Sequence, residues 1–526
     1  TSLGRFWTLE SENFVSGPLL KTLNGRLAFK TVQEFAGWQI SQLRPDDRLG
    51  KQDKWSARGS LDWRPLDSLV FRLRVEGWRD HSDPQAPQIV GIIPGNVAIG
   101  EEGLSPHIRD YPLIAQKGAD PRIADWPITP PFPGTLHDNF LMESMKTIWD
   151  VSDTMSLTAL ASHLRMESNG SPQLQGFDIT ETDLVTNANI DTFAGEIRLF
   201  EKWFDGRFAW MIGIHVSHDD AVEDQLAYTE NAGALFSNIQ IPSGGNPITD
   251  LVDLRGRPKI DQQAIFLNTD TELTDTLSLN LGVRYTRNQE DFKFCASEPL
   301  EANRDRPEAF GLSNVFTILS FQTAAQYMLE TGMPGRPSVI MKGDCFSLGE
   351  DGNNDPFISS LDEDNLSGRA ALSWQPTDDA LLFASVSRGF KAGGFPVLNP
   401  ARKSQLVAVK QEELLAGEAG SKLSFFDRRL HLNLTGFYYH YKDKQLLTKT
   451  LDDIFGPLPI LQNAPKSHVW GLEVETQTMP FEGFYLGFAG SYIKTKIVEF
   501  VGRNSEGTVE DFAGKPFNYA PELQLS

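Results

Sequence analysis

Residues 277–286 read LSLNLGVRYT and alternate strictly between apolar and polar side chains. Successive side chains of a β-strand point to opposite faces, so every second residue shares a face. The apolar residues of this stretch are Leu277, Leu279, Leu281, Val283 and Tyr285. The pattern therefore predicts a strand with one apolar and one polar face.

Two further stretches repeat this alternation. In residues 69–78, apolar positions alternate with a face that carries Arg and Glu. Residues 430–441 alternate in the same way and end in a cluster of Phe and Tyr. Aromatic rings at a strand end suit the headgroup zone of a bilayer, where a ring stays half hydrated.

Short connections rich in Pro, Gly and Asp recur between the predicted strands. Such residues supply a preset φ, tolerance of positive φ and local side-chain hydrogen bonds. The eight connections are SGPLLKT (16–22), RPLDS (64–68), DVSDT (150–154), WFDGR (203–207), LTDT (273–276), PTDD (376–379), FFDRR (425–429) and PFEG (480–483). Eight tight hairpins predict sixteen strands.

Long stretches alternate with these tight turns, and we expect them to be irregular. They cover residues 81–135, 222–259, 295–360 and 395–409. Soluble domains rarely contain structureless loops longer than about 15 residues. Tight turns on one rim and long loops on the other are typical of an outer-membrane barrel, whose strands cross the lipid in about 9 to 11 residues.

Soluble β-proteins are the alternative, because hairpins and alternation also occur in β-sandwiches and β-propellers. A propeller repeats every 40 to 50 residues or so, whereas the turns here are irregularly spaced. The predicted strands at 69–80 and 430–442 are also longer than the usual five or six residues of globular proteins. These features favour the membrane barrel.

Composition excludes several other classes. The chain has 48 Lys and Arg against 70 Asp and Glu, a formal charge of −22, and no basic run suited to nucleic acid. It contains no continuous apolar window of about 18 residues, which excludes helical membrane spans. The first residues, TSLGRFWTLE, do not form a signal peptide. The chain is therefore either cytoplasmic or a piece of a longer protein.

An ordered series of segments resembles the barrel of TonB-dependent outer-membrane receptors. The segments are SRGFKAGGF (387–395), EELLAGEAGSKLSFFDRRLHLNLTGFYYHYKDKQL (412–446) and NAPKSHVWGLEVETQTMPFEGFYLGFAGSYIKT (463–495). The front of the chain resembles the family as well, through FVSGPLLKTLNGRLAF (14–29), the DW-x-P turn at 62–65 and EGWRDHSDPQAPQ (76–88). The sequence departs from the family pattern at LLAGEAG (414–420).

The resemblance implies an all-β fold, a transmembrane antiparallel barrel of the 22-stranded, plugged type. We expect about 16 to 17 strands here, with short periplasmic turns and long extracellular loops. Residues 1–526 would be family strands 2 to 17 and the start of strand 18, at 518–526, with the plug domain and the last strands absent. The chain is thus expected to be an internal fragment.

The implied function is active uptake across the Gram-negative outer membrane. The expected partners are outer-membrane lipid and lipopolysaccharide, the TonB system through the missing plug, and a scarce solute, with a ferric siderophore as first choice. Oligosaccharide, cobalamin or aromatic compounds are alternative substrates. A passive porin-like channel and a soluble β-rich binding or carbohydrate-active protein are alternative classes. No nucleic acid partner, cofactor or catalytic residue is expected.

The resemblance also suggests site residues. Ligand contacts would come from loop aromatics and arginines, for which we select Arg109, Tyr111, Trp126 and Arg336. Extracellular loops meet an oxidising environment, so the two cysteines, Cys295 and Cys345, are expected to form a disulfide; two reduced thiols in an unrelated fold are the alternative.

The remaining motifs do not predict a metal, calcium or hydrolase site. His215 and His218 are three residues apart on a predicted strand, so their rings should face opposite sides and not share a metal. The segment GEDGNND (349–355) lacks the residue order of a calcium loop and is interpreted as acidic surface. No hydrolase signature occurs.

Overall fold

The computed structural model describes most of the chain, and the statements below concern only that part. It covers residues 1–88, 120, 122–127, 134–173, 176, 178, 182–229, 251–302, 304, 311–396, 402–452, 456–504 and 508–526. Among these residues, no helix has both the length and the hydropathy of a membrane span.

Sixteen long antiparallel strands dominate the described residues, and each of the eight predicted turns joins two of them. They are β2 (Thr8–Leu20), β3 (Leu23–Glu34), β6 (Asp53–Leu66), β7 (Leu69–Asp80), β9 (Thr135–Asp150), β10 (Met155–Ser171), β11 (Thr182–Trp203), β12 (Phe208–Thr229), β13 (Leu251–Thr274), β14 (Leu277–Ser297), β15 (Phe357–Thr377), β16 (Ala380–Lys391), β17 (Glu412–Phe425), β18 (Leu430–Asp452), β19 (Gly456–Phe481) and β20 (Phe484–Glu499).

Shorter elements complete the fold. They are the strands β1 (Ser2–Leu3), β4 (Gln39–Ser41), β5 (Arg48–Leu49), β8 (Ile123–Ala124), β21 (Val501–Arg503), β22 (Val509–Asp511) and β23 (Leu523–Leu525), the helix α3 (Leu312–Thr331), and the 3-10 turns η1 (Arg5–Trp7), η2 (Phe204–Gly206) and η3 (Lys403–Leu406).

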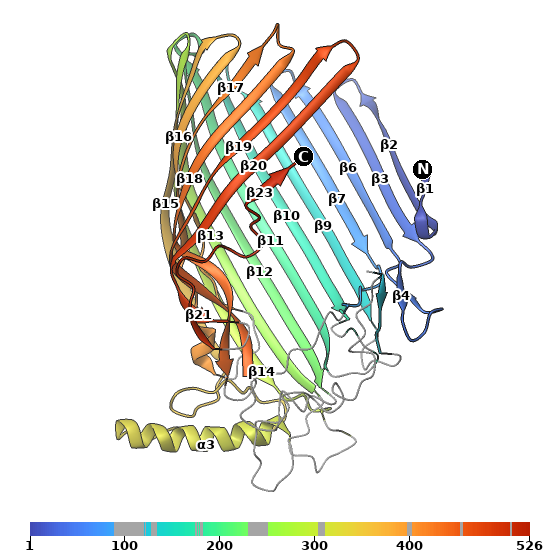
Figure 1. The fold of residues 1–526 in the computed structure, drawn as a ribbon, viewed down its shortest axis with the longest axis vertical. Helices are drawn as coiled ribbons and strands as arrows, with labels where there is room; N and C mark the ends of the chain where they lie inside the picture. Colours follow the sequence, from blue (N-terminus) through green and yellow to red (C-terminus); the bar gives the residue numbers. More distant parts are fainter. Residues whose placement is uncertain are drawn as a thin grey trace.

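The long strands form one curved sheet in chain order, with β1 and β23 added at its ends, eighteen strands in total (Figure 1). Every neighbour is antiparallel, from β1 with β2 to β20 with β23. The tight turns gather at one rim, whereas the long loops and α3 lie at the other (Figure 1). Among the described residues β2 pairs with β1 and β3, β20 pairs with β19 and β23, and no ladder joins β20 or β23 to β1 or β2.

Rows of cross-strand neighbours show which face of the sheet meets lipid. Ile214, Ile265, Tyr285 and Leu366 are aligned across β12 to β15 and each is at least 44% exposed. The intervening residues point to the other face and are mostly polar, as Arg284 is. Because a membrane barrel presents its apolar face to the bilayer, the first face is the outer one and the polar face lines the interior.

The strands are longer than the alternation predicts. The apolar outward positions of β14 end at Tyr285, but the strand continues to Ser297 with Arg287, Gln289 and Asp291 at the next outward positions. The period-two apolar pattern marks only the part that crosses lipid, since residues beyond the bilayer meet water on both sides. The alternation therefore underestimates strand length.

Two of the stretches expected to be irregular contain regular structure. In 222–259 the described residues, 222–229 and 251–259, extend β12 and β13, and residues 295–360 contain the 20-residue helix α3. The helix was not expected because it has no single apolar face and so lacks the 3.6-residue apolar period. The end of the helix does have a sequence signal, a glycine followed by a proline: Gly332 adopts φ 72° at the C-cap and Pro334 follows.

Candidate functional site

The loop after β14 forms a compact substructure at the loop-side rim. Its apolar core joins residues of α3 to the inward side chains at the loop-side ends of β13 and β14. Within this core, Phe316 of α3 stacks on Phe346 with ring centroids 4.3 Å apart, and Phe292 of β14 stacks on Phe395, after β16, at 4.9 Å. The shared core holds the loop against the strands.

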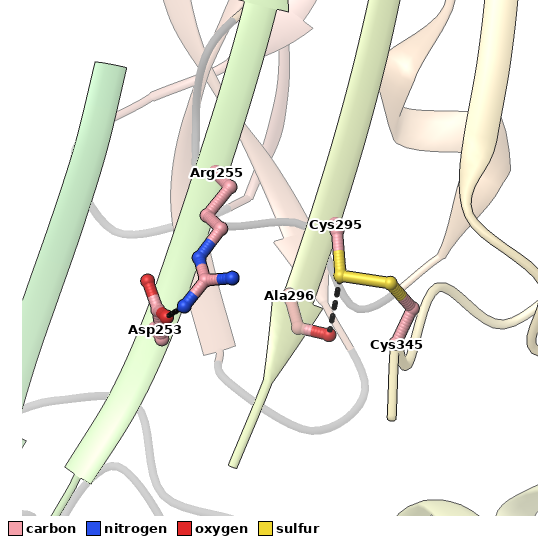
Figure 2. Close-up of a disulfide and its surroundings, with 5 residues drawn as sticks. All are labelled: Asp253, Arg255, Cys295, Ala296 and Cys345. Carbon is pink, nitrogen blue, oxygen red and sulfur yellow. Dashed lines mark hydrogen bonds and ion pairs between the residues drawn. A yellow bond between two sulfur atoms is a disulfide. The ribbon is translucent and has the colours of Figure 1, made fainter. Parts of the chain in front are cut away.

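A disulfide ties this loop to β14. Cys295, near the end of β14, is bonded to Cys345, 50 residues later, with the Cα atoms 5.3 Å apart (Figure 2). The Phe346 N–H donates to the Ala296 carbonyl at 2.7 Å, which continues the strand edge beside the bond. On the neighbouring strand β13, Arg255 forms an ion pair with Asp253 (Figure 2). The connection fixes both ends of the α3 loop.

A buried carboxylate fixes the start of α3. Glu298 is fully buried, and its Oε2 accepts hydrogen bonds from the Ser313 N–H at 2.8 Å and the Ser313 hydroxyl at 2.7 Å. Negative charge is favourable at a helix N-terminus, where backbone N–H groups lack partners. Lys342 Nζ lies 3.8 Å from the same carboxylate. Sequence reasoning missed Glu298, because nothing in its neighbourhood identifies it as a cap.

Arg336 lies on the same loop and is accessible. Its side chain is 68% exposed and forms an ion pair with Asp351. Burial opposes ionisation of Asp351, but hydrogen bonds from Arg336 and from the Asn353 N–H outweigh it, so the pKa of Asp351 is lowered. This pairing raises the pKa of Arg336. The role of Arg336 in ligand binding stays a prediction, and a ligand would compete with Asp351 for the guanidinium.

The acidic segment 349–355 is used in contacts within the loop. Asp351 holds Arg336, and the Asn353 side chain accepts a hydrogen bond from Lys403 Nζ at 3.0 Å. Burial lowers the pKa of Lys403, although Asp355 and Asp351 act in the other direction. Within the described residues no group of three or more His, Cys, Asp and Glu is arranged to hold a metal ion.

Trp126 is placed differently from Arg336. Its ring is only 5% exposed, and its Nε1–H donates to Asp47 at 3.1 Å. The guanidinium of Arg44 lies 5.9 Å from the ring and donates to the Trp126 carbonyl at 2.7 Å. The ring thus packs beside the small sheet β5-β4-β8 and would contact a ligand only after rearrangement. The predicted contacts Arg109 and Tyr111 lie outside the described residues.

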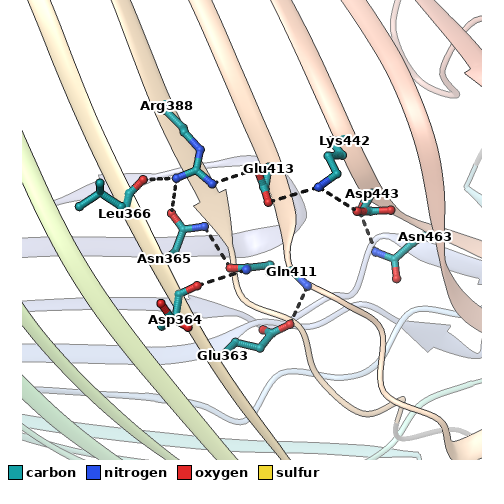
Figure 3. Close-up of polar contacts among 10 residues, drawn as sticks. All are labelled: Glu363, Asp364, Asn365, Leu366, Arg388, Gln411, Glu413, Lys442, Asp443 and Asn463. Atoms are coloured by element: carbon teal, nitrogen blue, oxygen red, sulfur yellow. Dashed lines mark hydrogen bonds and ion pairs between the residues drawn. The ribbon is translucent and has the colours of Figure 1, made fainter.

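A polar network at the rim surrounds the motif SRGFKAGGF (Figure 3). Arg388 of β16 donates to Glu413 Oε2 of β17 at 3.0 Å and to the Leu366 carbonyl of β15. Glu363 Oε1 accepts the Gln411 N–H at 2.9 Å (Figure 3). Its Oε2 accepts the Gly393 N–H at 2.8 Å. The carboxylate thereby fixes the chain just after β16.

Further contacts extend the same network toward β18 and β19. Asn365 Nδ2 donates to Gln411 Oε1 at 3.1 Å, and Asn463 Nδ2 donates to the Asp443 carbonyl at 2.7 Å. A Cβ atom at Gly393 would lie 2.3 Å from the Val409 carbonyl, so only glycine fits there. This close approach gives a physical reason for Gly393, one of the three glycines of the motif, where the chain lies against its neighbour.

The two histidines at the end of the predicted strand lie on opposite faces. His215 Nδ1 is 3.6 Å from Glu196 on the inward face, whereas His218 Nδ1 is 2.8 Å from Asp261 on the outward face. A shared metal site is therefore not formed by this pair. The loop-side rim, with its tethered loop and the exposed Arg336, remains the candidate binding site.

Comparisons with known proteins agree with this architecture. The family profile described as TonB dependent receptor-like, beta-barrel, matches residues 129–526. The ferric yersiniabactin uptake receptor FyuA from Yersinia pestis is similar with a TM-score of 0.65 at 14% identity, covering 99% of this chain and 63% of that one. The chain thus spans less than two thirds of that receptor.

Two other solved structures are similar to the same extent. The siderophore receptor PiuA from Acinetobacter baumannii has a TM-score of 0.62 at 12% identity, with 99% of this chain and 67% of that chain covered. The ferric-catecholate import receptor Fiu from E. coli K12, in its closed form, has a TM-score of 0.61 at 12% identity, with 99% and 66% covered. A search of curated sequences gave no match. Identities this low show the fold alone.

The family match covers most of the chain, and the sheet, its rims and its lipid-facing side follow the architecture that the resemblance predicted. The prediction of fold class and family is therefore confirmed. The chain belongs to the TonB-dependent receptor-like β-barrel family, whose members are transporters of the Gram-negative outer membrane and not enzymes.

Proposed function

We propose that this chain is the barrel of a receptor that imports a scarce solute across the outer membrane, with a ferric siderophore complex as the first candidate. The observation that carries the proposal is the match of nearly the whole chain to barrels of receptors named for iron complexes or siderophores. TonB-dependent import of oligosaccharide, cobalamin or aromatic compounds and passive porin-like diffusion are the competing possibilities.

The order of strands supports a specific place within such a receptor. We place the sixteen long strands as family strands 2 to 17, with the three residues of β23 at the start of strand 18. The plug and the last strands would then lie outside these 526 residues, in keeping with coverage of 63–67% of the three similar receptors. Contact with TonB would pass through that plug.

The loop-side rim supports solute capture. The disulfide and the apolar core hold the α3 loop in place, which lowers the entropy cost of forming a binding surface. Arg336 presents a planar cation suited to the oxygen atoms of an anionic iron complex. Binding groups on loops positioned by a rigid sheet are the usual arrangement for recognition.

Uptake of radioactive iron by cells that produce the complete receptor tests this function. Cells supplied with ferric siderophores of the catecholate, hydroxamate and phenolate classes should accumulate iron from at least one, and only when TonB is present. Accumulation that persists without TonB would indicate a passive channel. No accumulation from any class, together with TonB-dependent uptake of an oligosaccharide or cobalamin, would overturn the siderophore proposal.

Arg336→Gln tests the rim, with Arg428→Gln as its matched control. Arg428 forms a comparable exposed ion pair with Asp379, 3.0 Å long, but at a tight turn on the opposite rim. The rim variant should weaken ligand binding about tenfold, the magnitude expected for one charged hydrogen bond. The turn variant should leave binding unchanged, and equal effects of both variants would contradict the assignment.

A further inference from the structure

Six basic side chains gather on the outer face of β18, β19 and β20, three strands that lie side by side (Figure 1). We call this group the outer cation cluster. It consists of His440, Lys442, Lys466, His468, Lys494 and Lys496. The register aligns His440 with His468, Lys442 with Lys466, and Lys496 with His468. His440 Nδ1 and His468 Nδ1 are 3.2 Å apart.

The depth of the cluster follows from its neighbours on the same face. Tyr438, Trp470 and Tyr492 occupy the adjacent outward positions and are 38–51% exposed. Apolar outward residues, such as Leu472, come next toward the turn rim. Exposed Tyr and Trp on this face mark the interface between hydrocarbon and headgroups. Lys494 stands opposite Trp470 at this interface, and the other members of the cluster lie one or two positions further out, at the level of the lipid headgroups.

Three of the four lysines have no carboxylate partner among the described residues, and we call these lysines unpaired; Lys494 Nζ lies 6.0 Å from the centroid of the Trp470 ring. Lys442 Nζ lies 3.7 Å from Glu413, a carboxylate that Arg388 also binds. Lys466, Lys494 and Lys496 have no carboxylate within 4.0 Å among the described residues, although Glu499 stands opposite Lys466 in the register. Like charges on neighbouring strands are unfavourable, so an anion at this position would be stabilising.

An apolar groove adjoins the cluster on the same outer face. It runs across β15 to β18 and ends at Tyr438, which also contacts the cluster through a 3.0 Å hydrogen bond between its hydroxyl and His468. Five of its outward residues are small, namely Ala370, Ala384, Gly417, Ala419 and Gly436, and Leu279, Leu372 and Val386 form apolar walls. Small side chains leave a channel in the lipid-facing surface, and the chemistry of that channel suits a hydrocarbon chain.

We propose that the outer cation cluster and this groove together form a binding site for a phosphorylated glycolipid of the outer leaflet. The lysines bind the phosphate groups, Trp470 and Tyr492 border the sugar, and an acyl chain lies in the groove. The binding of several phosphates by point charges is a typical use of lysine. The site is independent of the transported solute, so its failure would leave the proposed uptake function untouched.

The test compares two triple variants of the complete receptor in detergent. Lys466→Gln, Lys494→Gln and Lys496→Gln remove the unpaired cations. The control, Arg257→Gln, Lys259→Gln and Arg287→Gln, removes three outward cations of β13 and β14 that each pair with an aspartate. Binding of bisphosphorylated lipid A and of its enzymatically dephosphorylated form is measured by native mass spectrometry.

The cluster variant should bind the bisphosphorylated lipid about 100-fold more weakly, from a factor of about five for each lysine near an anionic surface. The control variant and all binding of the dephosphorylated lipid should change less than threefold. Equal losses in the two triple variants, or no loss in the cluster variant, would overturn the proposal. A Lys→Arg triple at the cluster, which keeps the charge, should restore binding and so separates loss of charge from misfolding.

Two further measurements distinguish a lipid from a free anion. Ala419→Leu narrows the groove without changing charge and should weaken lipid binding about fivefold, the effect of losing part of an acyl-chain contact. Inorganic phosphate at millimolar concentration should not displace the lipid. Complete displacement by inorganic phosphate, or an unchanged affinity in the groove variant, would mean that the cluster binds small anions and not a lipid.

Discussion

The outer faces of β12–β15 and of β18–β20 both carry charged residues directly beyond their last apolar outward positions. The two faces differ in whether these cations have carboxylate partners on neighbouring strands. On β12–β15 the cations are neutralised across strands, as in Lys259–Asp220 at 2.9 Å and Arg287–Asp362 at 2.6 Å. On β18–β20, Lys442 faces Lys466, whereas Lys494 and Lys496 face Trp470 and His468 and have no carboxylate partner among the described residues. Exposed ion pairs contribute little to stability, so the difference concerns what each surface offers to the membrane.

The two regions differ at the loop-side rim as well. The strands β13 and β14 continue beyond the charged band and support the α3 loop, its apolar core and the disulfide. Beyond β20 the described chain forms the small hairpin of β21 and β22 and the short strand β23, which pairs with β20. One side of the barrel thus carries a folded rim structure above a neutralised band, and the other carries an uncovered cationic band.

Removal of the disulfide should have the largest effect, and only on the β12–β15 side. Cys295→Ser with Cys345→Ser frees a 50-residue loop, for which chain entropy predicts a loss of about 4 kcal/mol in the stability of that loop. Hydrogen exchange should show α3 opening while β18–β20 stay protected. A loss of protection in both regions would show that the rim structure and the cationic face are coupled.

An arginine placed within the apolar belt should have the next largest effect and should be equal in both regions. Val283→Arg on β14 and Leu472→Arg on β19 each put a charge on the lipid face just inside the interface, at a cost of about 1 to 3 kcal/mol, between the values for the interface and the bilayer centre. Gln289→Arg, beyond the belt, is the matched control and should cost almost nothing. Unfolding in lipid vesicles measures the costs, and a large cost at Gln289 would move the boundary of the belt.

Much of the fold could be predicted from the sequence. The eight turns could be predicted because Pro, Gly and Asp favour turns locally. The lipid-crossing part of each strand alternates with a period of two, so the hairpins and the family could also be predicted. Beyond the lipid, both faces of a strand are wet and the period disappears, which hid the true length of β14. Helix α3 was missed because its contacts lie on several sides, with Phe316 packed inward and Leu329 exposed.

The site was harder to predict because its features arise from pairing between strands. From the sequence, Trp126 is predicted to be an accessible loop aromatic. In the structure it is buried and contacts Asp47 and Arg44, about 80 residues away in the sequence. The sequence IKTK (493–496) shows two lysines at alternate positions, so on a strand both point to the same face. Only the register of β19 and β20 shows that Lys496 stands opposite His468 and Lys494 opposite Trp470, because the sequence of one strand does not show which residues lie beside it.

A single carboxylate introduced among the lysines of β18–β20 should make that face resemble the face of β12–β15, where cations are paired. His468→Asp places an acid opposite Lys496 and beside Lys466, as Asp220 stands opposite Lys259. Binding of bisphosphorylated lipid A should fall about tenfold, from one added pair and one lost imidazole. His468→Asn keeps the polarity without the charge and is the control. Equal losses in the two variants would mean that the imidazole, not the charge balance, matters.

The reverse change on β12–β15 should have the smallest effect. Asp362→Asn leaves the guanidinium of Arg287 without its partner, while the nearby Gln289 stays in place. The free energy of unfolding should fall by less than about 1 kcal/mol, since the pair is half exposed. Affinity for bisphosphorylated lipid A should rise about twofold at low salt and not at high salt, because screening removes the gain. If affinity for the lipid does not rise even at low salt, an unpaired cation at this depth is not sufficient for lipid binding. The groove that ends at Tyr438 would then be the feature that gives β18–β20, and not β12–β15, a lipid site.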